Sequence, residues 1–205
     1  MTRWRLLALA TLVLALGFVG YVRLRAVQAD RIVEVLGLQP GMSVADVGAG
    51  RGDWSVELAR VVGPEGRVFA TEIDEGRLDD IERASRRAGL DNIRVIKAET
   101  RDTGLPEACC DAILLRHVYH HLTEPDATLA SLRAALRRGG LMAIVDFEPW
   151  GWSASAADVP PGRRGHGMPM ELLQDEVRGG GFEIVRAESG WSGRDYLVLA
   201  RRPQD

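Results

Sequence analysis

The sequence predicts a doubly wound α/β domain with a mostly parallel β-sheet, preceded by an N-terminal membrane-spanning helix. Short apolar runs rich in β-forming residues alternate with amphipathic helical stretches from Ala29 onward, which is the pattern of successive βαβ units. A glycine-rich turn follows the first of these runs, and an uncharged run of 17 residues, Leu6–Val22, lies near the N-terminus. We therefore expect an anchor or signal segment over residues 1–27 and one globular domain over residues 28–205.

The apolar run Leu6–Val22 has arginine residues on both sides. As a helix it would be roughly 25 Å long, close to the roughly 30 Å hydrocarbon core of a bilayer. Two other interpretations stay open: a cleavable secretory signal with a cleavage site at Val27-Gln28-Ala29, and a buried helix of the globular domain. Because the arginines before and after the run nearly balance, their charge does not decide the membrane topology.

The remaining elements are expected in chain order. Five apolar runs predict strands at Ser43–Val47, Arg67–Ile73, Ile93–Ala98, Ala112–Leu115 and Leu141–Phe147. Apolar residues at helical spacing predict the connecting helices Trp54–Val62, Leu78–Ala88 and Ala127–Leu136. The C-terminal part predicts a helix at Met170–Arg178 and an antiparallel pair of strands at Glu183–Glu188 and Tyr196–Arg201.

The composition is that of an ordinary folded protein. The 205 residues include 26 Lys and Arg against 29 Asp and Glu, a net charge of −3, and 46% are hydrophobic. This balance excludes a disordered chain and offers no broad basic surface, so small molecules or lipids are expected as partners and nucleic acid is not. Cys109 and Cys110 are neighbours, which rarely bridge each other, so no disulfide framework is expected. The oligomeric state stays open.

The turn after the first predicted strand carries glycine at every second position, Gly48, Gly50 and Gly52, with Asp46 two residues ahead of the first. Glycine lets a backbone approach a ligand closely and adopt positive φ. A dinucleotide site has the spacing Gly-x-Gly-x-x-Gly, whereas here the third glycine comes one residue early. The Asp46 carboxylate would repel a pyrophosphate and suits a ligand with an ammonium group. The alternative is a tight turn that binds nothing.

Further acidic residues end the next two strands. Glu72 follows the glycines by about twenty residues, where a carboxylate can accept both hydroxyls of a ribose, and Glu99 and Thr100 follow the third strand, where they could meet an adenine. Ligands of open α/β sheets bind outside the carboxyl ends of the strands, where all these residues are expected. The competing interpretation of Glu72 is a solvated acid, with Asp74 and Glu75 as neighbouring carboxylates.

From about Asp30 to Arg201 the chain resembles the class I S-adenosylmethionine-dependent methyltransferases. Within that family it most resembles the branch that methylates small molecules, quinones or lipids. The similarity rests on Asp46–Gly52, Glu72, Ala98–Thr100, Asp111–Leu122 and Leu136–Leu141. It implies a Rossmann-like, seven-stranded sheet whose last strand is antiparallel. It also implies S-adenosylmethionine as cofactor, and the supply of that cofactor favours a cytoplasmic domain over a periplasmic or secreted one. The candidate cofactor-binding residues are Asp46, Gly48, Gly50, Gly52, Glu72, Glu99, Thr100 and Arg116.

The candidate acceptor residues come from two places. His117 is the candidate for acceptor contact or proton abstraction, with Arg116 and Tyr119 beside it as orienting groups; a general base is needed only where the acceptor must lose a proton. His120 and His121 resemble a scaffold pair, and no metal is expected. The stretch from Trp150 to Met168 is expected to cover the acceptor, using Trp150, Trp152, Arg163 and His166, unless it is an ordered surface loop.

These observations predict an enzyme that transfers a methyl group from S-adenosylmethionine to a small, apolar or amphiphilic acceptor at the membrane. A non-catalytic module that binds S-adenosylmethionine as a sensor or interaction domain is one alternative. A nicotinamide-dependent oxidoreductase is the other.

Overall fold

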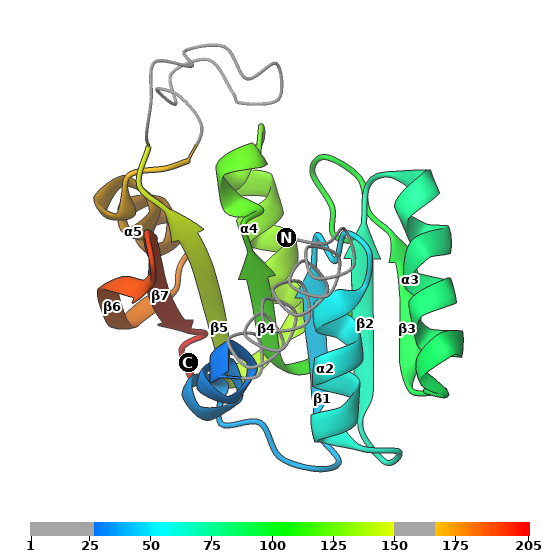
Figure 1. Ribbon diagram of the computed structural model, residues 1–205. Helices are drawn as coiled ribbons and strands as arrows, with labels where there is room; N and C mark the ends of the chain where they lie inside the picture. Colours follow the sequence, from blue (N-terminus) through cyan, green and yellow to red (C-terminus); the bar gives the residue numbers. More distant parts are fainter. Residues whose placement is uncertain (1–26, 150–166) are drawn as a thin grey trace, which may run out of the picture.

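The computed structural model describes residues 27–149 and 167–205 (Figure 1). In this part of the chain, seven strands form one sheet in the order β3-β2-β1-β4-β5-β7-β6. The strands are β1 (Ser43–Val47), β2 (Arg67–Glu72), β3 (Ile93–Lys97), β4 (Cys110–Arg116), β5 (Leu136–Phe147), β6 (Glu183–Ser192) and β7 (Asp195–Arg201). β1 to β5 pair in parallel, and β7 runs antiparallel between β5 and β6. The predicted seven-stranded sheet with an antiparallel last strand is confirmed.

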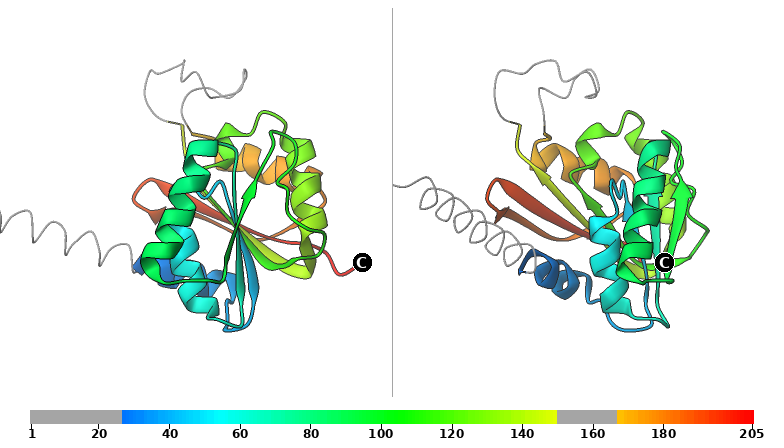
Figure 2. Two further views of the ribbon diagram at one scale, coloured as in Figure 1. Left: turned by 90° about the vertical axis from the view of Figure 1, so that its right-hand side faces the viewer. Right: turned by 45° about the vertical axis from the view of Figure 1, so that its right-hand side comes forward.

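Helices cover both faces of the sheet, as the turned views in Figure 2 show. They are α2 (Asp53–Val62), α3 (Glu75–Ala88), the short 3-10 helix η1 (Tyr119–His121), α4 (Pro125–Ala135) and α5 (Met170–Gly179). A further helical stretch covers residues 27–36. α2 and residues 27–36 pack on one face, and α4 and α5 pack on the other.

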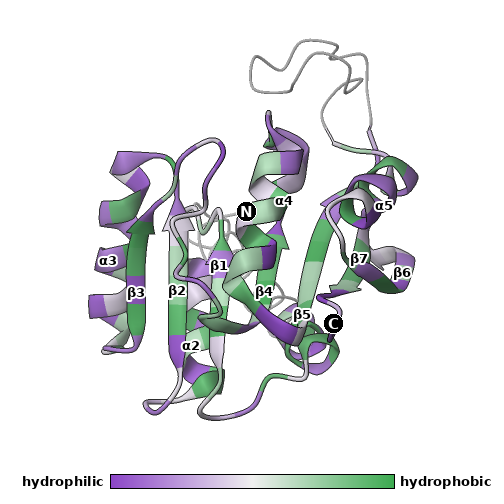
Figure 3. Ribbon diagram, turned by 180° about the vertical axis from the view of Figure 1, so that it is seen from behind, coloured by the Kyte–Doolittle hydropathy of each residue, from purple (hydrophilic) through white to green (hydrophobic). Residues whose placement is uncertain are grey.

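The two faces of the sheet follow from the alternation of side chains along each strand. In β1, Val44 packs against α2, whereas Ala45 and Val47 pack on the side of α4 and α5. The strands carry most of the apolar residues, and polar residues gather on the outer side of α3 (Figure 3). A doubly covered sheet of this kind needs apolar residues at nearly every strand position, which is why the central strands read as continuous apolar runs.

The helical stretch 27–36 contacts β6, the strand at one edge of the sheet. Ile32 and Leu36 are buried, and the guanidinium of Arg31 stacks on the ring of Trp191 in β6 at 3.7 Å from the ring centroid. Arg31 also donates to the main-chain oxygen of Trp191 and pairs with Glu188 at 3.3 Å. These contacts place the chain that follows Leu6–Val22 beside the β6–β7 hairpin.

The structure differs from the prediction at several element bounds and at the cysteines. α3 begins at Glu75, three residues before the predicted start, and β6 ends at Ser192, four residues after the predicted end. β5 begins at Leu136, five residues before the predicted start, because Leu136 pairs with Cys110 ahead of a bulge and Gly139 and Gly140 exchange main-chain hydrogen bonds with Arg202. Cys109 and Cys110 form a disulfide. Because this bridge joins neighbours, it closes no long loop of the chain.

Within residues 27–149 and 167–205, no helix is long and apolar enough to cross a membrane. The run Leu6–Val22 lies outside the described residues. The structure therefore tests neither the predicted membrane helix nor the predicted boundary between residues 27 and 28. The predicted anchor therefore stays a prediction.

Candidate functional site

A cavity of about 970 Å³ opens at the carboxyl ends of β1, β2, β3 and β4. Ligands of open α/β sheets bind at this edge, next to the point where the strand order reverses. The cavity brings together eight of the residues predicted from the sequence: Asp46, Gly48, Gly50, Glu72, Glu99, Thr100, Arg116 and His117.

The glycine turn forms one wall of the cavity. The main-chain N–H groups of Gly48 and Ala49 both donate to the carbonyl oxygen of Thr71 at 2.9 Å, which ties the turn to β2. Gly48 has a φ of 69°, in the left-handed region. A Cβ atom at Gly48 would overlap both methyl groups of Val118, with Cγ1 at 2.8 Å. The turn therefore requires glycine at position 48 for two independent reasons.

Gly52 has a different role from the predicted one, because it does not line the cavity. It is the residue before α2, with a φ of 80°, and a Cβ atom there would lie 3.0 Å from the Cα atom of Ile81 in α3. The third glycine thus permits close packing of two helices. The structure therefore does not place Gly52 on the wall of the cavity for which it was predicted.

Glu72 accepts several main-chain hydrogen bonds in the cavity wall. One oxygen of its carboxylate accepts the N–H of Gly50 at 2.8 Å, and the other accepts the N–H groups of Ile73 at 2.9 Å and Asp74 at 3.2 Å. The side chain is only 7% exposed. This carboxylate therefore joins the end of β2 to the glycine turn and holds a negative charge where a ligand hydroxyl would meet it.

Asp46 lies beneath the same wall and is buried. Its carboxylate accepts a hydrogen bond from the hydroxyl of Ser55 at 2.6 Å. Burial raises the pKa of Asp46 to about 6; the carboxylate of Glu72 also raises it, whereas the Ser55 hydrogen bond and the Arg116 charge lower it. Deprotonating Asp46 thus costs free energy that a bound cation would offset.

We expect Asp46→Asn to stabilise the ligand-free protein at pH 7. The folded protein holds the Asp46 proton with a pKa of about 6, against 3.8 for an unperturbed Asp, so the free energy of unfolding falls as pH rises through this range. The shift is worth on the order of 3 kcal/mol at neutral pH. Asparagine keeps an acceptor for Ser55 and carries no charge. Urea unfolding at pH 4 to 7 should show the advantage of the variant growing with pH, and a pH-independent difference would contradict the assignment.

The loop after β3 closes the cavity on the side of α4. Glu99 and Thr100 are exposed at its rim. The carbonyl oxygen of Thr100 accepts the hydroxyl of Thr128 at 3.3 Å, and Ser131 of α4 donates to Asp102 at 3.0 Å. The loop is therefore held by α4 and presents its exposed residues to the cavity, as the sequence predicts.

Arg116 and His117 end β4 at the opposite wall. Nη2 of Arg116 lies 3.9 Å from Oδ2 of Asp195, and its guanidinium lies 5.2 Å from the ring centroid of Trp54. Nε2 of His117 lies 3.0 Å from the same oxygen of Asp195. The two residues thus meet a carboxylate from β7 that no motif in the sequence marks.

Tyr119 and His120 do not reach the cavity. The Tyr119 side chain is 0% exposed, and its hydroxyl donates to Glu176 in α5 at 3.1 Å. Nδ1 of His120 lies 2.8 Å from Asp146 in β5. The 3-10 turn of η1 directs both side chains into the sheet, whereas His121 lines the cavity. The structure therefore does not bring Tyr119 to the site for which it was predicted.

The predicted acceptor residues Trp150, Trp152, Arg163 and His166 lie outside the described residues. Met168, at the end of the expected cover, is part of the core: its N–H donates to the carbonyl oxygen of Phe147, and its carbonyl oxygen accepts the hydroxyl of Tyr196. Among residues 27–149 and 167–205, no three His, Cys, Asp or Glu side chains are grouped to hold a metal ion.

The structure adds cavity residues that the sequence does not single out. Gln28 comes from the stretch 27–36, and its amide donates to Ser192 at 2.5 Å. Ile73 and Arg77 line the cavity beyond Glu72, and Trp54 lies at the start of α2. Gln28, on the cavity wall, and Asp195, beside His117, carry no sequence signal, because only the packing of residues 27–36 and of β7 against the rest of the domain brings them to these places.

The chain is similar in sequence to known methyltransferases. Residues 44–140 match the family model described as a methyltransferase domain. Over 116 residues, 56% of this chain and 47% of the relative, the sequence is 28% identical to the ubiquinone/menaquinone biosynthesis C-methyltransferase UbiE of Teredinibacter turnerae. The matched part thus spans about half the length of that curated relative.

Two solved structures share the fold over most of the chain. A SAM dependent methyltransferase from Aquifex aeolicus has a TM-score of 0.74 and 24% identity, covering 85% of this chain and 89% of its own. The 4+2 cyclase SpnF has a TM-score of 0.71 and 17% identity, covering 86% of this chain and 80% of its own. At these identities the likeness concerns the fold alone, and the second name shows that one fold carries more than one reaction.

Proposed function

Because this chain belongs to the class I S-adenosylmethionine-dependent methyltransferases, we propose that it transfers a methyl group from S-adenosylmethionine to a small, apolar or amphiphilic acceptor. The observation that carries the proposal is the pairing of Glu72 with the N–H of Gly50 at the edge of a cavity of about 970 Å³. This arrangement puts a carboxylate and a close-packed glycine turn on the same wall.

The cavity fits this cofactor in size and chemistry. Its volume of about 970 Å³ is at the upper end of ordinary ligand pockets, so it has room for an acceptor as well. Buried Asp46 suits the ammonium group of the methionine part, and Glu72 suits the ribose hydroxyls. The hydroxyl of Thr71, which lines the cavity, is buried and has no hydrogen-bond partner within the described residues. Such an orphaned buried group is the kind that a ligand satisfies.

The cofactor supplies a methyl group bonded to a positively charged sulfur. What remains for the chain is to hold donor and acceptor in line and to exclude water. We assign the donor side to the glycine turn with Asp46 and Glu72, and the acceptor side to His117 and Arg116 at the end of β4. Trp54 lies under Arg116 and keeps that guanidinium at the cavity wall.

A quinone-type acceptor is the form of the proposal that the relatives favour, since UbiE is named for ubiquinone and menaquinone biosynthesis. Such acceptors dissolve in membranes. The apolar run Leu6–Val22 would concentrate the enzyme at the same surface, and we propose a single-pass anchor with the catalytic domain in the cytoplasm. A reporter fused to the C-terminus distinguishes this topology from a periplasmic or secreted domain.

The test of the activity is product formation. The full-length chain in detergent is incubated with tritiated S-adenosylmethionine and a membrane lipid extract, and we expect label in the lipid phase. The Gly48→Ala variant is the negative control, because its new methyl group overlaps Val118 and the variant is expected to lose donor binding. A chain that binds S-adenosylhomocysteine and labels no extract would be a binding module, and one stabilised against heat by NAD alone would be an oxidoreductase.

A further inference from the structure

We propose that Asp195 is the positioning residue for His117, and that together they remove a proton from an acceptor hydroxyl such as that of a phenol or hydroquinone. The inference rests on the proposed methyl transfer and narrows its substrate class. It begins with a contact between residues that are far apart in the chain, since η1, α4, β5, α5 and β6 all lie between His117 and Asp195.

The backbone presents His117 to the cavity at a cost in strain. His117 has a φ of 55°, one of two non-glycine residues with positive φ in the described part of the chain. Its N–H is held by the carbonyl oxygen of Val145 in β5 at 2.8 Å. Left-handed conformations of non-glycine residues persist where the surroundings enforce them, and they gather at functional sites. Here β5 enforces a conformation that turns the imidazole away from the line of β4.

The imidazole ring is held on two sides. Its edge meets the ring of Phe147 at a centroid distance of 5.3 Å and an interplanar angle of 84°. Nε2 is shielded from solvent and lies 3.0 Å from Oδ2 of Asp195, although the ring does not yet aim its N–H at that oxygen. Hydrogen bonds of this kind are often misaligned before substrate binds. The side chain of His117 is still 33% exposed, so the rest of the ring reaches the cavity.

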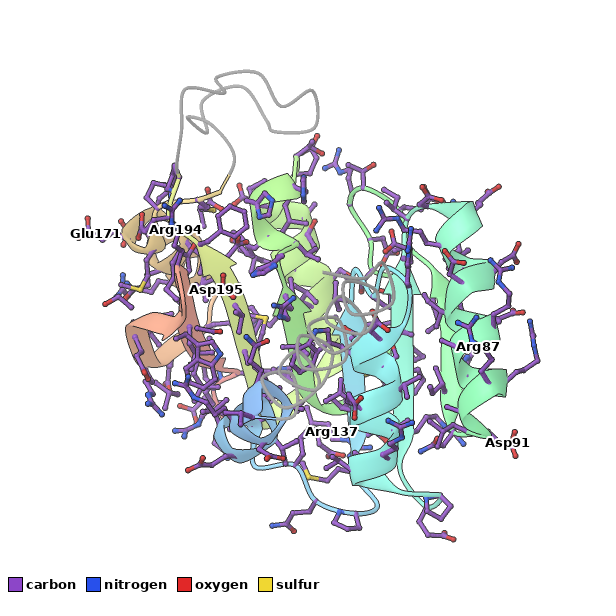
Figure 4. All side chains as sticks on the ribbon, viewed as in Figure 1. Arg87, Asp91, Arg137, Glu171, Arg194 and Asp195 are labelled. Carbon is purple, nitrogen blue, oxygen red and sulfur yellow. A yellow bond between two sulfur atoms is a disulfide. The ribbon has the colours of Figure 1, made fainter. Side chains whose placement is uncertain are left out.

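Asp195 is placed for this task by the β6–β7 hairpin. It is the first residue of β7, where Figure 4 labels it, and it lies opposite Phe147 of β5. Its side chain is 14% exposed. Its Oδ2 also faces Arg116 at 3.9 Å. Asp195 thus brings Arg116 and His117 to one carboxylate. His121 lies on the cavity wall, and the ring of His120, which pairs with buried Asp146, contacts Phe147 at a centroid distance of 4.9 Å. The Asp195 carboxylate, placed in this way, can orient Nε2 of His117.

The chemistry follows from this geometry. With Nε2–H directed at Asp195, Nδ1 is the nitrogen that can accept a proton. The acceptor hydroxyl gives its proton to Nδ1, and its electron pair, on the oxygen or on the conjugated ring carbon, forms the bond to the methyl carbon. The carbon–sulfur bond breaks with both electrons remaining on sulfur. For attack from carbon, the ring proton leaves to water as the hydroxyl regains one. An acceptor that has no proton to lose would need neither residue.

The test uses the full-length chain and an isoprenoid-substituted naphthohydroquinone as the probe acceptor. We expect Asp195→Asn to lower kcat on the order of 10- to 100-fold, part of the 10²- to 10⁴-fold that a general base contributes, with little change in the KM for S-adenosylmethionine. Asp195→Glu should recover part of the rate. Asp80→Asn is the matched control, because Asp80 pairs with Arg83 on the surface of α3 and does not line the cavity.

Two further measurements separate positioning from a structural role. If Asp195 acts through His117, the double variant with His117→Ala should be no slower than His117→Ala alone. Nitrogen-15 NMR of the histidine rings should show the Nε2–H tautomer of His117 in the wild type and a mixture in Asp195→Asn. The inference is overturned if kcat is unchanged in Asp195→Asn, if the two effects multiply, or if the tautomer does not respond. A wild-type chain that methylates no acceptor at all would instead contradict the proposed function.

Discussion

Gly48→Ala is expected to abolish measurable binding of S-adenosylhomocysteine. The new methyl group would overlap both methyl groups of Val118, and alanine would have to adopt a φ of 69°. The turn cannot move away without losing the two hydrogen bonds from Gly48 and Ala49 to Thr71. Left-handed strain and overpacking together should cost roughly 2 to 5 kcal/mol of stability. Isothermal titration should show an affinity loss above about 100-fold, the equivalent of about 2.7 kcal/mol.

Gly89→Ala is the matched control for this variant. Gly89 has a φ of 65° after the end of α3, and no atom lies within 4 Å of the place of its Cβ. Alanine there meets the same backbone strain without an overlap and away from the cavity, so stability should fall by about 1 kcal/mol and binding should not change. Removing the overlap in the double variant with Val118→Ala should restore part of the affinity. Wild-type affinity in Gly48→Ala would show that the turn does not contact the ligand.

Glu72→Ala is expected to weaken binding of S-adenosylhomocysteine by on the order of 1 to 3 kcal/mol, or about 5- to 150-fold. The carboxylate is lost as an acceptor for the ribose hydroxyls, and the N–H groups of Gly50, Ile73 and Asp74 lose their partner. Glu72→Gln should bind with an affinity between those of the wild type and Glu72→Ala, because the amide keeps one acceptor oxygen but directs N–H donors at main-chain N–H groups. Titration calorimetry measures both.

Glu75→Gln provides the comparison for Glu72. Glu75 lies three residues further on, is 85% exposed, and pairs with Lys97 outside the cavity. Glu75→Gln changes the net charge of the protein by the same amount as Glu72→Ala. A loss of affinity common to these two variants would therefore be a long-range effect of charge. Unchanged affinity in Glu72→Ala would exclude this carboxylate from the cofactor site.

The wall of the cavity formed by the glycine turn and Glu72 was largely predictable, because each of its residues lies next to a strand end that the local sequence pattern marks. Asp46, Gly48 and Gly50 surround the end of β1, and Glu72 ends β2. Parallel strands bring their carboxyl ends to one edge, so the order along the chain was enough to gather these residues. Gly52 was the exception, since spacing alone does not say whether a glycine faces a ligand or a neighbouring helix.

The surroundings of His117, which we propose to face the acceptor, were predictable only in part. His117 was found from its place after β4, but Tyr119, two residues later, points into the core and bonds Glu176. The direction of each side chain depends on the 3-10 turn η1, which the sequence did not reveal. The extra length of β5 likewise depends on pairing with the residues that follow β7.

By itself the sequence determined the order of strands and helices, the glycine turn and the carboxylates at the ends of β1 and β2, because these depend on apolar periodicity and on the conformational needs of single residues. Only the tertiary structure decided that Gln28 lines the cavity while bonding Ser192, and that Asp195 at the start of β7 lies 3.0 Å from His117. Contacts between distant segments form when apolar faces are buried against each other. The position of a single polar residue in the sequence does not indicate which distant segment will be packed beside it.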